Sequence, residues 1–240
     1  NQKNGEIAWK YKVGLRAHGK SIFSSPAIHN GIVYFGSYDG NVYALDTQTG
    51  KRKWVFMEAD WIGSSQAIAP DLELLFIGLE FGLFKKKGGI AALDLKTGKK
   101  KWEYEEIPEY VHCSPAYCPE KKMVAVGAND FCVYMFDAKI GKLKWKFQTE
   151  GEIKASLIFD IKNNLILFGS FDKHLYALDI DSGGIKGKFA TYDIIYSTPL
   201  VYQGNVYVAS FDKNLYSINL KTGELNWRFS ANGRFLASPV

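Results

Sequence analysis

The sequence lacks any apolar run near the roughly 18 residues that a transmembrane helix requires, so we expect no membrane insertion. Cysteine is scarce as well, with only Cys113, Cys118 and Cys132 in 240 residues. A small, odd number of cysteines argues against a disulfide scaffold and favours a reducing compartment. No signal peptide is visible, but the chain starts without Met. A removed leader would leave a periplasmic or secreted location open, so the compartment is not assigned.

Familiar catalytic motifs are also missing. The chain contains no P-loop, no dinucleotide fingerprint and no nucleophile–base pair, so no catalytic residue is assigned. His112 and Cys113 precede Cys118, but the two cysteines are about 17 Å apart along a strand, too far to share one metal ion. We therefore expect no metal site and no cofactor, and the chain is predicted not to be an enzyme.

Positive charge is present without the pattern of a nucleic-acid-binding surface. The chain has 30 Lys and Arg against 25 Asp and Glu, a net charge of +5, which is modest for its length. Several lysines directly precede a repeated Trp, where lysine protects an exposed strand edge against pairing with another chain. No aromatic stacking platform alternates with them, so nucleic acid is not an expected partner.

Aromatic residues and glycine are, by contrast, abundant, at 15% and 23 residues, which is typical of short strands joined by tight turns. One phrase occurs five times: YALDTQTGKRKW (43–54), AALDLKTGKKKW (91–102), MFDAKIGKLKW (135–145), YALDIDSGGIKG (176–187) and YSINLKTGELNW (216–227). Counted from Trp9, the last position of the phrase recurs every 40–48 residues. This period is typical of a unit of four strands, as in the blades of a β-propeller.

Each unit contains four short segments rich in β-branched and aromatic residues, such as SSPAI, IVYFGS, NVYALD and KRKWVF in the first unit. Asn30-Gly31 and Gln203-Gly204 predict tight hairpins between the first and second segments. The Asp and Gly of the repeated phrase predict a second turn, in which Asp bonds the backbone and Gly takes a left-handed conformation. These turn residues are Asp46/Gly50, Asp94/Gly98, Asp137/Gly141, Asp179/Gly183 and Asn219/Gly223. A further Asp recurs after Gly-Ser-like turns, at Asp39, Asp130, Asp172 and Asp212, and its recurrence predicts turn hydrogen bonds and not a catalytic carboxylate.

The Trp of the phrase is predicted to be structural. A four-stranded sheet cannot bury both of its faces alone, and one large flat side chain per blade can fill the wedge between neighbouring blades. The predicted blade-docking residues are Trp9, Trp54, Trp102, Trp145 and Trp227. The fourth unit has Gly187 at this position, so the seam between it and the next blade should pack differently.

The repeated pattern SSPAI-x-NG-x-VYFGS-x-DG-x-YALD-x-x-TGK-x-x-W resembles the blade repeat of pyrroloquinoline-quinone-type β-propellers. The resemblance implies an all-β propeller of four-stranded antiparallel blades, with five full repeats and partial repeats at residues 5–13 and 234–240. We expect residues 1–240 to be a single propeller domain and a portion of a longer chain. The family contains quinoprotein alcohol dehydrogenases and non-catalytic sensor or scaffold domains, so the repeat alone does not name a function.

Variation between the copies indicates where a partner could bind. In a four-stranded meander, the second-to-third and the fourth-to-first connections share one rim, and the copies differ most at the start of the first strand, on that rim. The variable positions include Phe23, Trp61, Tyr110, His112, Lys154 and Tyr196. Such variation on one rim favours a surface shaped for a partner or ligand, although tolerated loop variation is an open alternative.

One insertion lies on the same rim. Residues 79–89, LEFGLFKKKGG, replace the short second-to-third turn of the other units and present Phe81 and Phe84 beside Lys85, Lys86 and Lys87. Two apolar rings on a polar loop predict a protein-docking anchor, and the lysines suit an acidic surface or phosphates. The alternative is a solvated loop whose rings pack back onto the rim.

These observations predict a non-catalytic scaffold that binds another protein, or a fused domain of the same parent chain, through its variable rim. Two alternatives stay open: a sensor that holds a small ligand at the mouth of the channel, and the remnant of a quinoprotein dehydrogenase. The resemblance to the dehydrogenases implies an adjacent cysteine pair, a Trp beneath the quinone and a calcium site. The chain has no adjacent cysteines, and no residues can be assigned to calcium.

Overall fold

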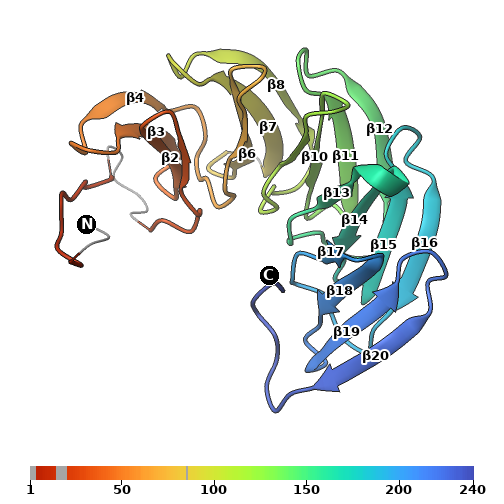
Figure 1. The fold of residues 1–240 in the computed structure, drawn as a ribbon. Coiled ribbons are helices and arrows are strands. Elements are labelled where there is room, and N and C mark those ends of the chain that lie inside the picture. Colours follow the sequence, from red (N-terminus) through yellow and green to blue (C-terminus); the bar gives the residue numbers. More distant parts are fainter. Residues whose placement is uncertain (1–3, 15–20, 85) are drawn as a thin grey trace. The chain divides into compact units, whose positions relative to one another are not determined.

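The protein consists almost entirely of short antiparallel strands (Figure 1). A computed structural model describes residues 4–14, 21–84 and 86–240. Within these residues, 20 strands form five separate four-stranded sheets, and the only helix is a 3-10 turn at Ile161–Asn163. Every sheet follows chain order from its first strand to its fourth, which confirms the predicted all-β fold built from four-stranded repeats. Across the same residues, no helix has the length and apolar character needed to span a membrane.

The strands have the following bounds. The first sheet contains β1 (Ala27–His29), β2 (Ile32–Ser37), β3 (Asn41–Asp46) and β4 (Arg52–Phe56). The second contains β5 (Ala67–Ala69), β6 (Leu74–Phe81), β7 (Lys87–Asp94) and β8 (Lys100–Ile107). The third contains β9 (Ala116–Cys118), β10 (Met123–Gly127), β11 (Cys132–Asp137) and β12 (Leu143–Gln148). The fourth contains β13 (Ile158–Asp160), β14 (Leu165–Gly169), β15 (His174–Asp179) and β16 (Ile185–Ala190). The fifth contains β17 (Leu200–Tyr202), β18 (Asn205–Ala209), β19 (Asn214–Asn219) and β20 (Leu225–Ser230).

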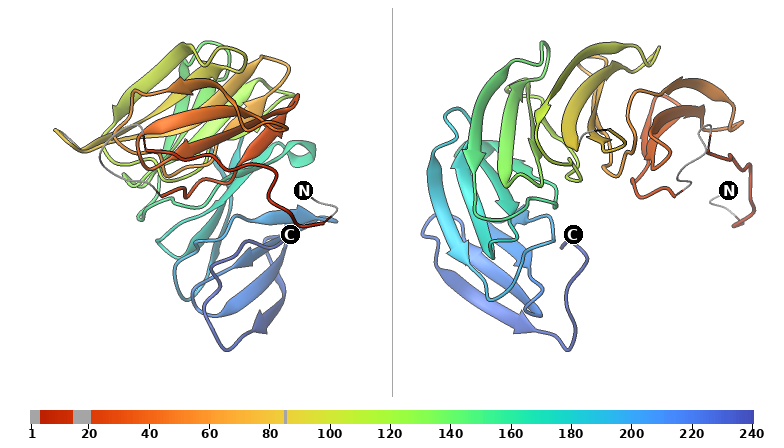
Figure 2. Two further views of the ribbon diagram at one scale, coloured as in Figure 1. Left: turned by 90° about the vertical axis from the view of Figure 1, so that its left-hand side faces the viewer. Right: turned by 180° about the vertical axis from the view of Figure 1, so that it is seen from behind.

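The chain divides into two compact units, which are described separately. The unit Asn1–Tyr110 holds the first two sheets, and the unit Val111–Val240 holds the other three. In both views of Figure 2 the strands of the blue fifth sheet lie side by side. The described residues of 5–13, expected to form the last strand of a partial repeat, form no strand, and neither do residues 234–240. That one domain covers residues 1–240 stays a prediction.

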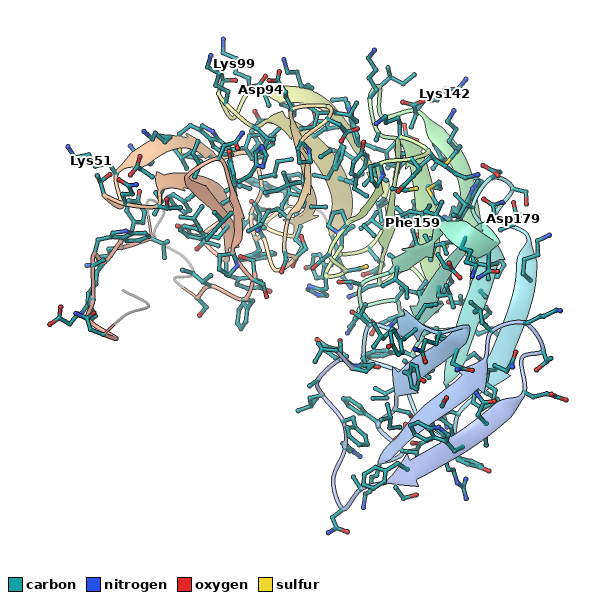
Figure 3. The ribbon with its side chains drawn as sticks, in the orientation of Figure 1. Lys51, Asp94, Lys99, Lys142, Phe159 and Asp179 are labelled. Carbon is teal, nitrogen blue, oxygen red and sulfur yellow. The ribbon has the colours of Figure 1, made fainter. Side chains whose placement is uncertain are left out.

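The turns between strands follow the predicted chemistry. Asn30 and Gly31, between β1 and β2, have φ angles of 47° and 73°, and Gln203 and Gly204 have 48° and 77°. Two successive residues with positive φ form a tight turn, and the twist of this turn matches the twist of the two strands that it joins. The other hairpins, which carry the Asp of the repeated phrase, are visible at the labelled Asp94 and Asp179 (Figure 3).

The Asp of the repeated phrase organises its turn as predicted. Asp46 Oδ1 accepts hydrogen bonds from the amides of Gln48 and Thr49 and from the Thr49 hydroxyl, and Gly50 adopts a φ of 67°. The Thr49 amide and hydroxyl, followed by Lys53 and the Gln48 amide, lower the pKa of the Asp46 carboxyl to about 2. The charged carboxylate therefore stabilises this turn at neutral pH.

At Trp9, Trp54 and Trp145 the repeated Trp lies on the turn between the third and fourth strands of the sheet that follows it in the chain. The Trp54 side chain is 8% exposed, and its indole Nε1 donates to the Leu95 carbonyl at 3.0 Å. The ring lies so close to Gly98 that a Cβ there would be 2.5 Å from it. Trp9 reaches the Thr47 carbonyl and Trp145 the Ile180 carbonyl in the same way, at 2.9 and 2.8 Å.

Trp102 and Trp227 also pack against aromatic residues of their own sheets. Trp102 packs against Phe76 of its own sheet, with ring centroids 5.7 Å apart. Trp227 packs against Tyr207, at 6.0 Å, and its side chain is 46% exposed. Burial at this repeat position therefore differs from copy to copy.

Candidate partner-binding rim

Two kinds of connection meet at one end of each blade, and we call this end the variable rim. It is formed by the turn between the second and third strands and by the segment that leads into the first strand. Backbone hydrogen bonds join them: the amides of Tyr38, Phe171 and Phe211 donate to the carbonyls of Ser21, Glu152 and Ile194, at 2.9, 2.9 and 3.0 Å. The pairing of these two connections follows from the meander, as expected from the sequence.

A buried Asp–Tyr pair fixes this rim in several blades. The Tyr43, Tyr176 and Tyr216 hydroxyls donate to Asp39, Asp172 and Asp212, at 2.7, 2.6 and 2.6 Å. Each carboxylate also accepts a backbone amide from the segment that precedes its blade in the chain: Gly14, Glu150 and Tyr192 respectively. The recurring Asp was expected to serve turn chemistry, and it does; its Tyr partner four residues later was not foreseen.

The electrostatics of the pair favour a charged carboxylate and a neutral phenol. Burial alone would raise the pKa of Asp172, but hydrogen bonds from the Tyr176 hydroxyl and from the Glu150 and His174 amides outweigh it, and its pKa lies below the ordinary value. Burial raises the pKa of Tyr43 to about 12, and its hydrogen bond to Asp39 acts in the same direction. The hydrogen bonds from Tyr to Asp therefore join the second-to-third turn to the third strand in each of these blades.

Four aromatic side chains form a continuous row on the variable rim of the unit Asn1–Tyr110. Phe23 meets Tyr38 edge to face at 5.2 Å, Tyr38 stacks with Trp61 at 6.1 Å, and Trp61 meets Tyr110 edge to face at 6.2 Å between ring centroids. We call Phe23, Tyr38, Trp61 and Tyr110 the aromatic row. Three of them were predicted as rim residues, and the structure brings these three together through Tyr38.

Glu80 lies at the base of this row. Its side chain is fully buried, and its Oε1 accepts the Gly63 amide at 2.9 Å, while its backbone pairs with Trp61 in both directions. Burial raises the pKa of Tyr38, and the nearby charges of Glu80 and Tyr110 add to the effect. The second blade therefore uses Glu where the other blades use the Asp of the pair.

The insertion at residues 79–89 is a longer hairpin and not an irregular loop. Strands β6 and β7 pair as far as Phe81 and Lys87. Phe81 is half-buried and packs against the core of the first two sheets, so it differs from the exposed anchor expected from the sequence. The neighbouring Leu83 and Phe84 are instead exposed, by 58% and completely. We call Leu83 and Phe84 the hairpin tip.

Side chains at the base of this hairpin hold its turn and its lysines. Asp60 Oδ2 accepts the amides of Gly82 and Leu83 at 2.9 and 3.0 Å. Lys86 pairs with Glu109 at 2.6 Å and lies over the Tyr110 ring, and Lys87 pairs with Glu105 and lies over Phe81. Lys86 and Lys87 thus have acidic partners within the chain, whereas Lys85 lies outside the described residues.

The unit Val111–Val240 carries a second, shorter aromatic cluster on its variable rim. Tyr196 lies between Phe171 and Phe211, with centroid distances of 5.9 and 6.0 Å. Lys154 and Arg234 lie over the two phenylalanine rings, at 5.0 and 5.6 Å. The remaining predicted rim residue, His112, is half-buried in this unit.

Sequence reasoning missed the aromatic residues contributed by the second-to-third turns. Tyr38, Phe171 and Phe211 each stand between a Ser and an Asp, in SYD or SFD. This triplet was interpreted only as turn chemistry around the Asp. Its middle residue points to the rim position next to the variable first strand, so an aromatic residue there is the signal that would have found the two clusters.

The cysteines have no contact suited to metal binding. All three are buried; the Cys113 thiol donates to the Ala155 carbonyl at 3.0 Å, and burial raises its pKa to about 12. Over residues 4–14, 21–84 and 86–240, no three His, Cys, Asp or Glu side chains converge as metal ligands would. No residues of that part of the chain can be assigned to a calcium–quinone site, and no reaction step is derived through one.

Comparison with known proteins identifies the fold family. No curated protein sequence matches the chain. Similar solved structures include the computationally designed protein Ika8 (TM-score 0.77, 17% identity, 92% of this chain and 66% of that one). BamB from Moraxella catarrhalis is also similar (0.73, 19%, 96% and 66%), as is quinohemoprotein alcohol dehydrogenase from Comamonas testosteroni (0.75, 17%, 95% and 46%). The chain thus spans just under two thirds, or less, of the length of these proteins.

At these identities the solved structures show the fold alone. The family model adds more, because the one described as outer membrane protein assembly factor BamB matches residues 1–109 and 129–239. The chain therefore belongs to the pyrroloquinoline-quinone-type β-propeller repeat family that this BamB model describes.

Proposed function

We propose that this chain is a non-catalytic β-propeller scaffold that binds another protein, or another domain of its parent chain, through the hairpin tip and the aromatic row. The observation that carries the proposal is the complete exposure of Phe84, next to an exposed Leu83, on the longest hairpin of the described residues. Membership of a family described by an assembly factor supports a role in protein interaction.

The hairpin suits a docking anchor because it holds its apolar tip in place before binding. Asp60 fixes the Gly82 and Leu83 amides, and ion pairs join Lys86 and Lys87, on the C-terminal side of the tip, to Glu109 and Glu105. An anchor that is already ordered loses less conformational entropy when a partner binds. Large aromatic side chains also dominate the binding free energy of protein interfaces.

The ion pairs of two hairpin lysines change the kind of partner that we expect. Lys86 and Lys87 are matched by Glu109 and Glu105, so they offer less unbalanced charge to an acidic surface or to phosphates than the sequence indicated. The proposed partner therefore presents an apolar pocket for Phe84, with polar groups around it.

Site-specific photo-crosslinking tests this proposal. A photoreactive amino acid at Phe84 should give a defined crosslinked product in the native host. The same amino acid at Ile140, an exposed apolar residue of the β11–β12 hairpin at the opposite end of its blade, should not. With the crosslinked partner purified, Leu83→Ala/Phe84→Ala should weaken binding about 30-fold, as expected for loss of a hot spot of about 2 kcal/mol.

Two results would argue against the proposal. Equal crosslinking from positions 84 and 140 would mean that the tip has no specific partner. A rise in melting temperature on adding a pyrroloquinoline quinone with calcium would favour the quinoprotein alternative, because only a ligand that binds the folded state stabilises it.

A further inference from the structure

One seam in the unit Val111–Val240 has a cavity where its counterparts hold an indole ring. The seam lies between the fourth sheet, β13–β16, and the fifth, β17–β20. Gly187 pairs with Ala177 in the register in which Trp54 pairs with Ala44, so Gly187 occupies the position of the repeated Trp. The enclosed space beside Gly187 is about 40 Å³, and it widens into an opening to solvent that brings the total to about 320 Å³.

The cavity has the lining that surrounds the indole in the filled seams. Its walls include Leu167, Val206, Ile218 and Leu220, and its floor includes Gly223. By alignment of the repeats, Leu220 and Gly223 correspond to Leu95 and Gly98, which accept the indole N–H and support the ring of Trp54. The surface of the cavity is almost entirely apolar.

The two groups that would contact an indole ring are Gly223 and the Leu220 carbonyl, and both are accessible. A Cβ on Gly223 would meet no atom within 4 Å, whereas on Gly98 or Gly183 it would collide with an indole at 2.5 or 2.7 Å. The Leu220 carbonyl accepts no hydrogen bond from the described residues, whereas its counterparts Leu95 and Ile180 accept one from Trp54 and Trp145.

We propose that this cavity is a binding site for an indole ring supplied from outside the described chain. The ring would lie on Gly223 between the two sheets and donate its N–H to the Leu220 carbonyl. The protein fills the same kind of seam with its own indole at Trp54 and again at Trp145, so the apolar lining and the acceptor correspond to those that hold an indole there. This inference is independent of the variable rim.

Titration with indole, followed by amide NMR, tests the site directly. Indole should shift the amide signals of Leu220 and Gly223 saturably, with a dissociation constant on the order of 1 mM for a ring of this size. 1-Methylindole, which lacks the donor hydrogen, should bind about tenfold more weakly, since an unmade hydrogen bond leaves the carbonyl without its donor.

A matched pair of variants separates filling of the cavity from a general effect of the substitution. A Cβ at Gly187 would come no closer than 3.7 Å to another residue, so Gly187→Ala should keep the cavity open and bind indole like the wild type. Gly187→Trp should fill the cavity, abolish indole binding and raise the melting temperature above that of Gly187→Ala. A cooperative thermal transition for both variants establishes that they are folded.

The source of the ring is distinguished by a second comparison. Binding of both 3-methylindole and N-acetyltryptophanamide would indicate a Trp side chain of a peptide. Binding of 3-methylindole alone would indicate a free small molecule, and either result supports an indole site. The absence of saturable shifts up to the solubility limit of indole, or equal binding by Gly187→Trp and wild type, would overturn the proposal and leave a water-filled gap.

Discussion

Replacing Trp54 with Ala should destabilise the protein far more than the same change at Trp227, although both residues end the same repeated phrase. Their side chains are 8% and 46% exposed. Since a Trp side chain buries up to about 250 Å², this difference corresponds to roughly 95 Å² of surface, worth about 2 kcal/mol. Trp54 also donates a hydrogen bond to the Leu95 carbonyl, which adds about 1 kcal/mol.

We therefore expect Trp54→Ala to lower the free energy of unfolding by about 3–5 kcal/mol, as for other fully buried Trp residues, and Trp227→Ala to lower it by about 1 kcal/mol. Urea unfolding followed by far-UV circular dichroism measures both values. If the two units unfold in separate transitions, each variant is read from the transition of its own unit. Equal losses for the two variants would refute the idea that packing on the next blade's turn makes this Trp structural.

Three further predictions concern turns and thiols. Gly98→Ala should cost about 3 kcal/mol in thermal or urea unfolding, because its Cβ would meet the Trp54 ring; Gly223→Ala, with a similar φ of 73° and open space, should cost about 1 kcal/mol. The Asp46 pKa is depressed to about 2, so its stabilisation is complete above pH 3.8 and is lost as the pH falls through 2. Asp46→Asn should therefore flatten the decline of unfolding free energy with acid over this range, and an unchanged slope would contradict the assignment. Cys113, buried with a pKa raised to about 12, should react with a disulfide reagent only when the protein opens, so fast labelling of the native protein would contradict its burial.

The repeat was predictable from the sequence because the turns of each copy are determined by residues within that copy. Asn30-Gly31 requires a left-handed turn, and the Asp46 to Gly50 phrase supplies both the hydrogen-bond acceptor and the flexible residue. These effects act within five residues, so propensity and pattern decide them. The repeat period predicted the position of Trp54. It also placed Gly187 at the corresponding position of the fourth unit and so predicted a differently packed seam there.

Contacts between turns could not be read in the same way. Tyr38 and Trp61 stack although they are 23 residues apart, and the interval contains two whole strands, β3 and β4, and the segment that joins two blades. Phe81 was expected on the surface because it stands in an inserted segment. Pairing of β6 with β7 up to Lys87 instead turned its side chain toward the core. Such contacts depend on tertiary packing, which cannot be derived from the pattern of a single sequence.

The Asp–Tyr ties have an evolutionary consequence. Asp172 and Asp212 hold the incoming connections through the main-chain amides of Glu150 and Tyr192, so the side chains at these two positions take no part in these two hydrogen bonds. Substitutions there can accumulate without loosening the framework. A propeller whose connections are held through main-chain amides can acquire new specificities when a few surface residues change. These connections are therefore suitable positions for grafting a foreign recognition loop.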